Sequence, residues 1–250
     1  MSGPFWCVDP RDFVLVEGPD ALTYLQSQVS QDLRGLAVGD SAYSLVLEPA
    51  GKLDVALRVL RTGEQSYVLD TDAGAGEALL ARLNRFKIRV KAELTVLDWT
   101  CVAVRGDGAA DVTGGDDVWK VSAWRGDGTA VDLLGADVGG PAGVRAGSTE
   151  ELLAARIEAA WPVAGVDYVP GEAIPSSIGV TAEAVSFTKG CYPGQELVER
   201  MDSRGAQAPR SLHTIDVPAG TAPGDEVEVG GAPAVVRSVA GTRALAFLRR

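Results

Sequence analysis

The octapeptide Lys189-Gly190-Cys191-Tyr192-Pro193-Gly194-Gln195-Glu196 is the most informative stretch of the chain, because it sets a single thiol between glycines and beside a lysine. The thiolate is the reactive form of cysteine, and a nearby ammonium favours it, so Lys189 is expected to lower the pKa of Cys191. Pro193-Gly194 predicts a turn, and the peptide is therefore interpreted as a shaped loop that presents side chains. An ordinary turn around a buried, inert cysteine is the alternative.

The composition of the whole chain limits the functions that this loop could serve. With 250 residues, 46% of them hydrophobic, the chain can form one large domain or two to three small ones. A net charge of −11 opposes binding to a polyanion, so the sequence disfavours nucleic-acid and membrane-surface roles. The first residues lack a signal-peptide pattern, and no apolar stretch approaches the ~20 residues of a membrane span. We therefore expect a cytoplasmic protein.

The cysteines and the single histidine restrict the chemistry further. Cys7, Cys101 and Cys191 are widely separated and form no C-x-x-C pair, so neither a disulfide framework nor a zinc site fits. A multi-histidine metal centre is impossible, and a nucleophile activated by histidine would have to use His213. His213 lies in an alternating, strand-like pattern and is interpreted as structural.

Hydrophobic periodicity predicts a mixture of strands and helices. Strands are expected at about 13–17, 41–47, 54–61, 66–70, 94–98, 100–105, 118–124 and 130–134. Helices are expected between Gly18 and Gly35, at about 75–86, and from a capping box at Ser148 to Trp161. Because strand pairs follow one another closely, an α+β fold is favoured over a doubly wound parallel sheet. The tail after Leu212 predicts a small β module, too short to be stable alone.

Four segments of the chain carry a resemblance to a known family. The octapeptide followed by Arg200 resembles the signature K-G-C-[FY]-x-G-Q-E-x-x-x-R of the YgfZ family, folate-binding relatives of the glycine-cleavage T-protein. Val16–Asp32, Leu47–Lys52 and Arg156–Ala159 resemble the family's V-x-G-x-D-A, L-x-P-x-G-[KR] and R-[IL]-E-A segments, in the same order. Together the four segments extend over about residues 13 to 205.

The resemblance implies a T-protein-like α+β fold arranged around a central hole. The fold would consist of two ferredoxin-like α+β units and, as a third part, a small C-terminal β-barrel module. The first unit would be a discontinuous folate-binding domain of residues 1–44 plus 100–205, with residues 45–99 as the inserted second unit. Residues 206–250 would form the barrel-like domain, for which the tail is short.

The resemblance also implies a folate site. T-proteins use an aspartate of an acid pair in methylene transfer, but the comparable Gly51–Ala56 keeps a single acid, Asp54, so this catalysis is not expected to be intact. One carboxylate can accept both hydrogen bonds that a pterin edge donates. The resemblance suggests Asp132 or Glu158 for this carboxylate, with Arg156 paired to Glu158 or to the ligand. The alternatives are a surface acid for Asp54 and a bridge between domains for Arg156 and Glu158.

The function that the resemblance implies is a tetrahydrofolate-binding accessory protein supporting iron-sulfur cluster assembly or repair in client enzymes. Cys191 would be its key residue, with Gln195, Glu196 and Arg200 of the signature at the cofactor, tetrahydrofolate or a one-carbon derivative. Its partners would be iron-sulfur enzymes or cluster-assembly proteins. Clusters usually take four thiolate ligands, so three separated cysteines predict no stably bound metal. A folate-dependent aminomethyl- or methyltransferase and an acidic scaffold that binds no folate stay open as alternatives.

Overall fold

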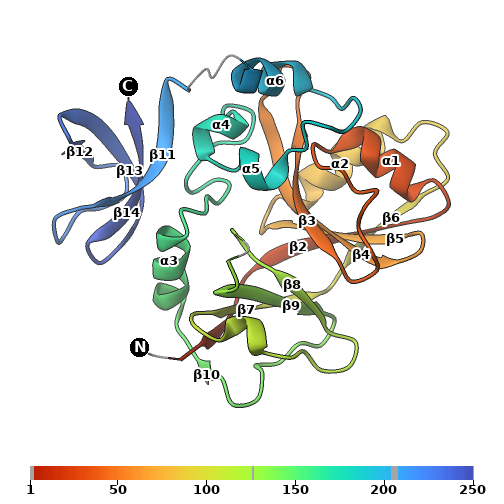
Figure 1. Ribbon diagram of the computed structural model, residues 1–250, viewed down its shortest axis with the longest axis horizontal. Helices are drawn as coiled ribbons and strands as arrows, with labels where there is room; N and C mark the ends of the chain where they lie inside the picture. The colour runs from red at the N-terminus through yellow and green to blue at the C-terminus, as the bar shows by residue number, and fades with distance from the viewer. Residues whose placement is uncertain (1–2, 126, 204–207, 250) are drawn as a thin grey trace.

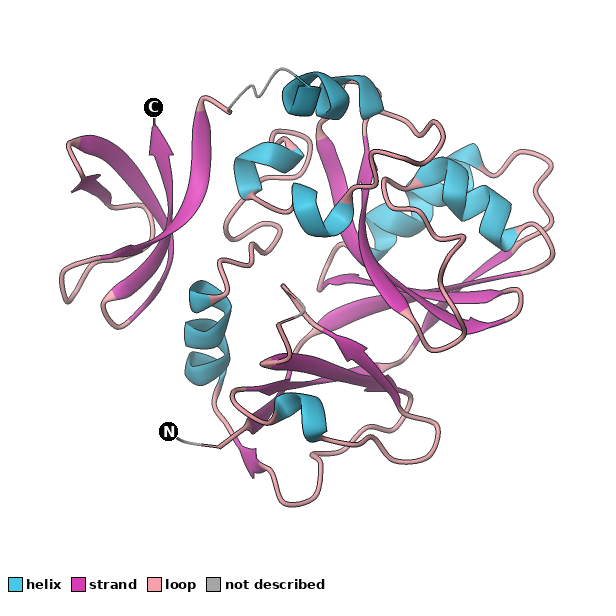
Figure 2. Cartoon of the chain, viewed as in Figure 1, coloured by secondary structure: helices cyan, strands magenta, loops and turns pink. Residues whose placement is uncertain are grey.

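Three β-sheets and several short helices meet around a common centre in the computed structural model, which describes residues 3–125, 127–203 and 208–249. The helices gather mainly around one sheet, while the C-terminal sheet stands at the side of the molecule (Figures 1 and 2). Among the described residues, no helix combines the length and the apolar character that crossing a bilayer would need.

The first sheet has the strand order β3-β4-β5-β2-β6, and its neighbours all run antiparallel. Its strands are β2 (Arg11–Glu17), β3 (Ser41–Leu47), β4 (Leu53–Gly63), β5 (Ser66–Asp72) and β6 (Glu93–Leu97). Helices α1 (Ala21–Gln28) and α2 (Gly76–Phe86) lie along this sheet (Figure 1) and bury Leu25, Leu79 and Leu83 in one apolar cluster with its strands.

The second sheet, with the order β10-β1-β7-β9-β8, combines the start of the chain with its middle. Its strands are β1 (Phe5–Val8), β7 (Thr100–Arg105), β8 (Trp119–Ser122), β9 (Ala130–Gly135) and β10 (Arg145–Ala146). A 3-10 turn, Ala109–Asp111, follows β7. Hydrogen bonding thus places β2–β6, between residues 11 and 97, in the first sheet, and this sheet includes β2 and the start of β3, which precede residue 45. The domain boundaries drawn from the resemblance stay a prediction.

The third sheet is formed by the tail, with the order β11-β14-β13-β12. Its strands are β11 (Arg210–Asp216), β12 (Glu226–Val229), β13 (Ala232–Ala240) and β14 (Arg243–Arg249). Its own apolar cluster is small, but Leu212, Leu245 and Phe247 join the central core of the molecule. The short β module is therefore anchored on the rest of the chain. Its description as a barrel, like that of the other units as ferredoxin-like, stays a prediction.

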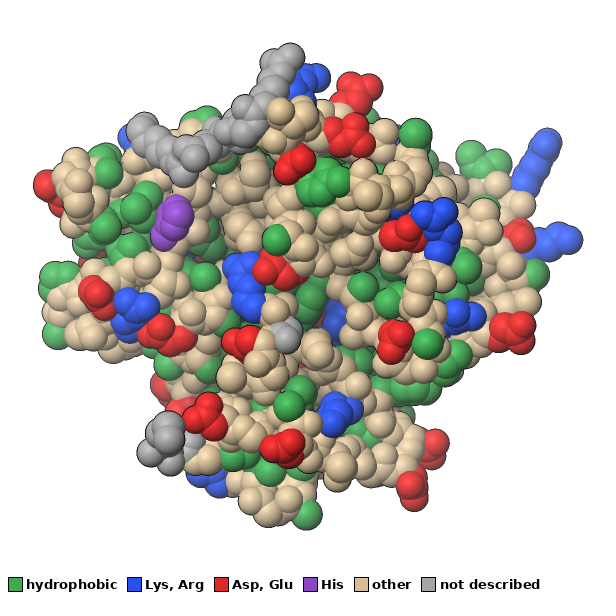
Figure 3. Space-filling view, in the orientation of Figure 1, with side chains coloured by type: hydrophobic (Ala, Val, Ile, Leu, Met, Phe, Trp, Pro, Cys, Tyr) green, Lys and Arg blue, Asp and Glu red, His purple; other side chains and the backbone are tan. Residues whose placement is uncertain are grey.

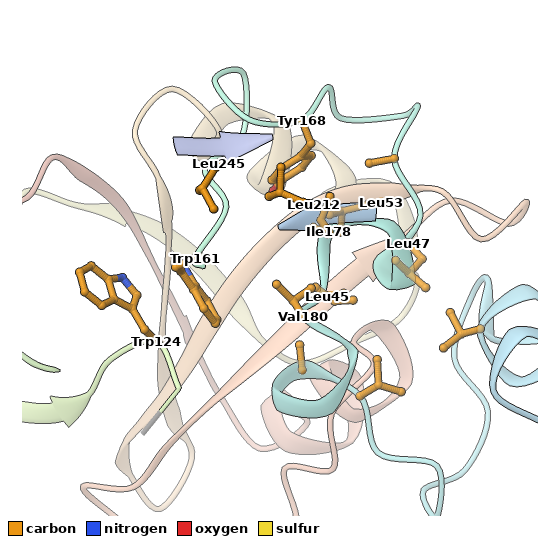
Figure 4. Close-up of a cluster of buried hydrophobic side chains, with 14 of the residues drawn as sticks. Leu45, Leu47, Leu53, Trp124, Trp161, Tyr168, Ile178, Val180, Leu212 and Leu245 are labelled. Atoms are coloured by element: carbon orange, nitrogen blue, oxygen red, sulfur yellow. The ribbon is translucent and has the colours of Figure 1, made fainter. Parts of the chain in front are cut away.

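The central core connects all these parts (Figure 4). Leu45 of β3, Trp124, Trp161 and Leu245 of β14 belong to this one buried cluster. Around it lie the helices α3 (Thr149–Glu158), α4 (Pro175–Ile178), α5 (Thr181–Ala184) and α6 (Gln195–Ser203). The predicted capping box at Ser148 is confirmed, since its side chain accepts from the amide of Glu151 and the Glu151 carboxylate accepts in return.

The first helix is shorter than the periodicity predicts, ending at Gln28 instead of near Gly35. The backbone beyond it forms tertiary hydrogen bonds in place of helical ones. The amide of Ser30 donates to the carbonyl of Leu45 at 3.0 Å, and the hydroxyl of Ser30 donates to the carbonyl of Ala184 at 2.6 Å. Partners this distant in sequence leave no trace in a local hydrophobic pattern.

Candidate functional site

The structure places Cys191 on the surface, which favours the interpretation of the octapeptide as a presenting loop. Cys191 is exposed, whereas Cys7 and Cys101 are buried. Burial raises the pKa of the Cys101 thiol well above its ordinary value. Cys191 is thus the cysteine whose sulfur meets solvent, and an accessible thiol can act as a nucleophile, a redox group or a metal ligand.

Lys189 fixes the loop to the last turn of α1 and to the segment that follows this helix. Its ammonium donates three hydrogen bonds to the backbone carbonyls of Gln26, Val29 and Gln31, at 2.7, 2.5 and 3.1 Å. Burial lowers the pKa of Lys189 to about 8. No hydrogen bond joins Lys189 to Cys191 among the described residues, so the expected effect of this lysine on the thiol stays a prediction. Its observed contacts serve to position the loop.

Two glycines interlock the loop with the turn between β3 and β4. Gly194 and Gly51 have φ angles of +82° and +78°, in the left-handed region that glycine adopts most readily. A Cβ atom on Gly194 would lie 2.4 Å from the carbonyl oxygen of Glu48, and one on Gly51 would lie 2.4 Å from Cβ of Leu197. Two of the segments that carry the family resemblance therefore meet backbone against backbone.

The last part of the signature forms the first turns of α6. The side-chain carbonyl of Gln195 accepts a hydrogen bond from the amide of Tyr192 at 3.0 Å, which closes the turn around Gly194. Tyr192 is buried, and its burial raises the pKa of its hydroxyl to about 12. Glu196 and Arg200 lie on the exposed face of the helix. The packing residues of the loop thus face inward and Cys191 faces solvent.

Asp54 lies at the start of β4, directly after the glycine turn. Its carboxylate is 28% exposed and stands 3.5 Å from Nε of Arg82. Burial raises the pKa of Asp54, and the guanidinium of Arg82 works against this shift. The structure therefore places Asp54 beside a cation near the loop, and a catalytic role for it stays a prediction.

Asp132 lies inside a buried network of charges between the first two sheets. Its two carboxylate oxygens are each 2.8 Å from an arginine, one from Arg58 and one from Arg105. Burial raises the pKa of Asp132, but these guanidinium groups outweigh it and bring the pKa to about 2. Arg58 also binds Asp70 at 2.8 Å, and Arg11 binds Asp70 at 2.5 Å. Both oxygens of the Asp132 carboxylate therefore pair with arginines, whereas the sequence suggested that this carboxylate would bind the pterin.

Sequence reasoning missed Arg58 and Asp70, the centre of this network. Both are buried, with 1% and 0% of the residue exposed. A signal exists in hindsight for Arg58, which lies within the otherwise apolar run Val55–Leu60, and it is weaker for Asp70, which follows the apolar run Tyr67–Leu69. Charged side chains are rarely buried unless they are paired, so such a position indicates a partner elsewhere in the chain.

Arg156 and Glu158 connect α3 to the third sheet. Arg156 donates to the buried carboxylate of Asp167 and, at 2.8 Å, to the hydroxyl of Ser238 on β13. Glu158 accepts two hydrogen bonds from Arg243 on β14, at 2.7 and 3.0 Å. These contacts fit the alternative in which both residues bridge parts of the molecule, and their role toward a ligand stays a prediction.

A cavity of about 260 Å³ next to this bridge offers the chemistry that a pterin needs. Trp124, Arg125, Asp127 and Glu158 are among its lining residues. Arg105 also lines it, and the buried Nε and Nη2 of this arginine have no hydrogen-bond partner among the described residues. An aromatic face, carboxylates and unpaired donors together fit a flat, nitrogen-rich ring. Beside Tyr43 and Trp161, by contrast, only about 20 Å³ is free, enough for about one water molecule.

Within the described ranges, no three histidine, cysteine or acidic residues come together in a way that could hold a metal ion. The predicted absence of a stably bound metal stays a prediction.

Residues 11–115 match the family model of the GCVT N-terminal domain. Over its whole length the fold is similar to the crystal structure of glycine cleavage system aminomethyltransferase T from Bartonella henselae. The alignment covers 99% of this chain and 79% of the aminomethyltransferase chain, with a TM-score of 0.72 and 18% sequence identity. The two matches support placing the chain in the GcvT superfamily, and its mixed fold of several sheets and few helices is similar to that of the aminomethyltransferase.

Within this superfamily the curated relatives support a YgfZ-type member. It is 27% identical over 233 residues to the tRNA-modifying protein YgfZ of Vibrio vulnificus strain YJ016, covering 83% of this chain and 68% of that protein. It is 26% identical over 237 residues to the mitochondrial iron-sulfur cluster assembly factor IBA57 homolog of Mycosarcoma maydis. This match covers 86% of this chain and 58% of that protein. An uncharacterized protein of Haemophilus influenzae is 28% identical to this chain over 193 residues, which cover 76% of this chain and 66% of that protein. The chain thus spans about two thirds of the length of the first two bacterial relatives.

Proposed function

We propose that this protein is a folate-binding accessory factor that supports iron-sulfur cluster assembly or repair in client enzymes and acts through Cys191. The observation that carries the proposal is the loop geometry. Lys189, Gly194 and Gln195 hold the loop from the inside, while the thiol of Cys191 is exposed. The name of the cluster assembly factor to which the chain is similar supports the connection with iron-sulfur proteins.

The proposed folate site is the cavity of about 260 Å³ beside α3. Asp127 and Glu158 would accept hydrogen bonds from the pterin edge, Trp124 would contact the ring, and Arg105 would direct its free donors toward it. Tetrahydrofolate, when bound, supplies a carrier of one-carbon units. The guanidinium of Arg243, 2.7 Å from Glu158, orients this carboxylate.

The bacterial relatives carry a name that refers to tRNA modification. We propose that any such connection runs through client enzymes and not through tRNA bound by this chain, because its net charge is −11. Acidic and basic side chains are interspersed over the face that Figure 3 shows, and lysine and arginine form no broad patch on that face. A cytoplasmic location belongs to the same proposal.

The test compares Cys191→Ala with Thr188→Ala, an exposed neighbour in the same loop. In a strain lacking the gene, the Thr188 variant should restore iron-sulfur enzyme activity like the wild type, and the Cys191 variant should restore less than a tenth of it. Calorimetry with tetrahydrofolate and urea unfolding of the purified proteins should give the same values for all three. Full rescue by Cys191→Ala would overturn the proposal, and multiple turnovers with a methylamine donor that Asp54→Asn abolishes would assign a transferase instead.

A further inference from the structure

A second cavity, of about 460 Å³, lies between the third sheet and the segment of residues 168–177. It is distinct from the cavity beside α3 and shares no lining residue with it. Four of its lining side chains are cations, contributed by Lys52 of the glycine turn and by Arg210, Arg237 and Arg249 of the third sheet. We refer to it as the basic cavity.

Within the described ranges, the cations of the basic cavity form no ion pair with a carboxylate. Nine other arginines of the chain form ion pairs, but none of these four does so among the described residues. The chain has 34 acidic residues against 23 basic ones, and all 34 lie within the described ranges. Only one acid, Glu172, lines the cavity. In so acidic a protein, four unpaired cations around one hollow indicate a place for an external anion.

The register of the third sheet brings like charges together. Arg210 of β11 and Arg249 of β14 are directly opposite each other, a placement that destabilises an antiparallel pair. Arg237 lies at the register shift between Val236 and Ser238, and such bulges redirect a side chain. Arg210 and Arg237 both lie over the ring of Phe247, at 5.2 and 5.9 Å from its centroid. Three guanidinium groups thus converge, and none of them forms an ion pair within the part of the chain that the structure describes.

Neutral donors complete the cavity. Tyr168 lines it and is 2% exposed, and its buried hydroxyl has no hydrogen-bond partner among the described residues. Burial raises the pKa of Tyr168, so the hydroxyl keeps its proton and can donate. Among the residues that the structure describes, Lys52 and Arg237 donate only to backbone carbonyls, those of Glu172 and Asp167, which leaves further donors on each cation.

We propose that the basic cavity binds a small polyanion, a molecule with two or more phosphate or carboxylate groups close together. Four cations and one carboxylate, Glu172, give the lining a formal charge of about +3, which matches a diphosphate or a tricarboxylate. Arginine forks pair with either group through two parallel hydrogen bonds. Lys52 follows Gly51, the glycine locked against the Cys191 loop, so the ligand would lie next to the turn that supports this loop. The inference does not depend on folate binding.

The test is calorimetry of the full chain with pyrophosphate, citrate and inorganic phosphate. Pyrophosphate or citrate should bind saturably with one site, more tightly than inorganic phosphate, and the tighter of the two identifies the ligand as a phosphate or a carboxylate. The double variant Arg210→Gln/Arg249→Gln should weaken this binding at least tenfold. Arg85→Gln/Lys120→Gln has the same net charge with the cavity intact and should bind like the wild type.

Thermal unfolding gives a second measurement that does not require the variants to be equally stable. The anion should raise the unfolding midpoint of the wild type and of the Arg85→Gln/Lys120→Gln control, and it should leave that of the cavity variant unchanged. Without anion, the cavity variant should unfold no earlier than the wild type, because the repulsion between Arg210 and Arg249 is removed. The proposal is overturned if neither anion binds in low salt, or if both double variants lose binding equally.

Discussion

Replacing Gly194 with alanine tests whether the contact of two glycines holds the Cys191 loop. The φ angle of +82° costs alanine about 1–2 kcal/mol, of which the less flexible unfolded chain returns about 0.4–1 kcal/mol. The added methyl group would lie 2.4 Å from the carbonyl oxygen of Glu48 and 2.8 Å from Cβ of Leu47. Neither atom is the end of a flexible side chain, so overpacking adds about 1–3 kcal/mol. Gly194→Ala should therefore destabilise the protein by about 1–5 kcal/mol.

The matched control is Gly220→Ala. Gly220 has a φ angle of +88°, and a Cβ atom there would meet nothing within 4 Å. The conformational cost is therefore shared, and the difference between the variants measures the close approach alone, about 1–3 kcal/mol. Urea unfolding followed by tryptophan fluorescence and far-ultraviolet circular dichroism provides the two free energies, provided that the transitions coincide.

Equal destabilisation of the two variants would refute the close approach, because only the φ angle would then matter. A large loss in Gly194→Ala has a further consequence, since the strained contact lies three residues from Cys191. The thiol should then react with iodoacetamide at a changed rate in Gly194→Ala and at the wild-type rate in Gly220→Ala.

Two further predictions concern buried groups. Asp132→Asn removes the carboxylate that pairs with Arg105 and one of the two that pair with Arg58, and it should cost about 3–5 kcal/mol at pH 7, against less than about 1 kcal/mol for the exposed Asp216→Asn, by urea unfolding. The folded pKa of Asp132, about 2, lies below its ordinary value, so its contribution is present above pH 4 and is lost as the pH falls through 2. The difference between wild type and Asp132→Asn should shrink accordingly, and a constant difference would contradict the ion pairs. Iodoacetamide should label Cys191 alone in the native protein, by mass spectrometry, and labelling of a buried cysteine at the same rate would contradict the burial.

Local patterns predicted most elements of the fold. The strands at 41–47 and 100–105 are confirmed to the residue, and the helix expected at 75–86 begins one residue later. These segments carry their own signal, because hydrophobic spacing and capping residues act within one turn or one strand. Helix α6, by contrast, was not predicted, since the turn residues Pro193 and Gly194 dominate the sequence just before it.

Contacts between distant residues could not be predicted in the same way. The apolar neighbours of Asp132 correctly indicate burial, but its partner Arg58 is 74 positions away in the chain and could be identified only in the folded structure. The hydrogen-bond partners of Lys189 could not be predicted either. Its three acceptors are carbonyl groups about 160 positions away in the chain, and a backbone carbonyl has no residue-specific signature. Sequence adjacency suggested Cys191 as its partner, whereas the fold provides others.

The inward-facing residues of the loop can each be explained by stability. Lys189 binds three carbonyls, Gly194 permits a close approach, and Gln195 closes a turn. No such reason exists for a thiol at the exposed position 191, where substitutions usually change stability by less than about 0.5 kcal/mol. A loss of function in Cys191→Ala could not then be attributed to unfolding, whereas the same loss in Lys189 or Gly194 variants could. Position 191 is therefore the place in this loop where mutation separates chemistry from folding.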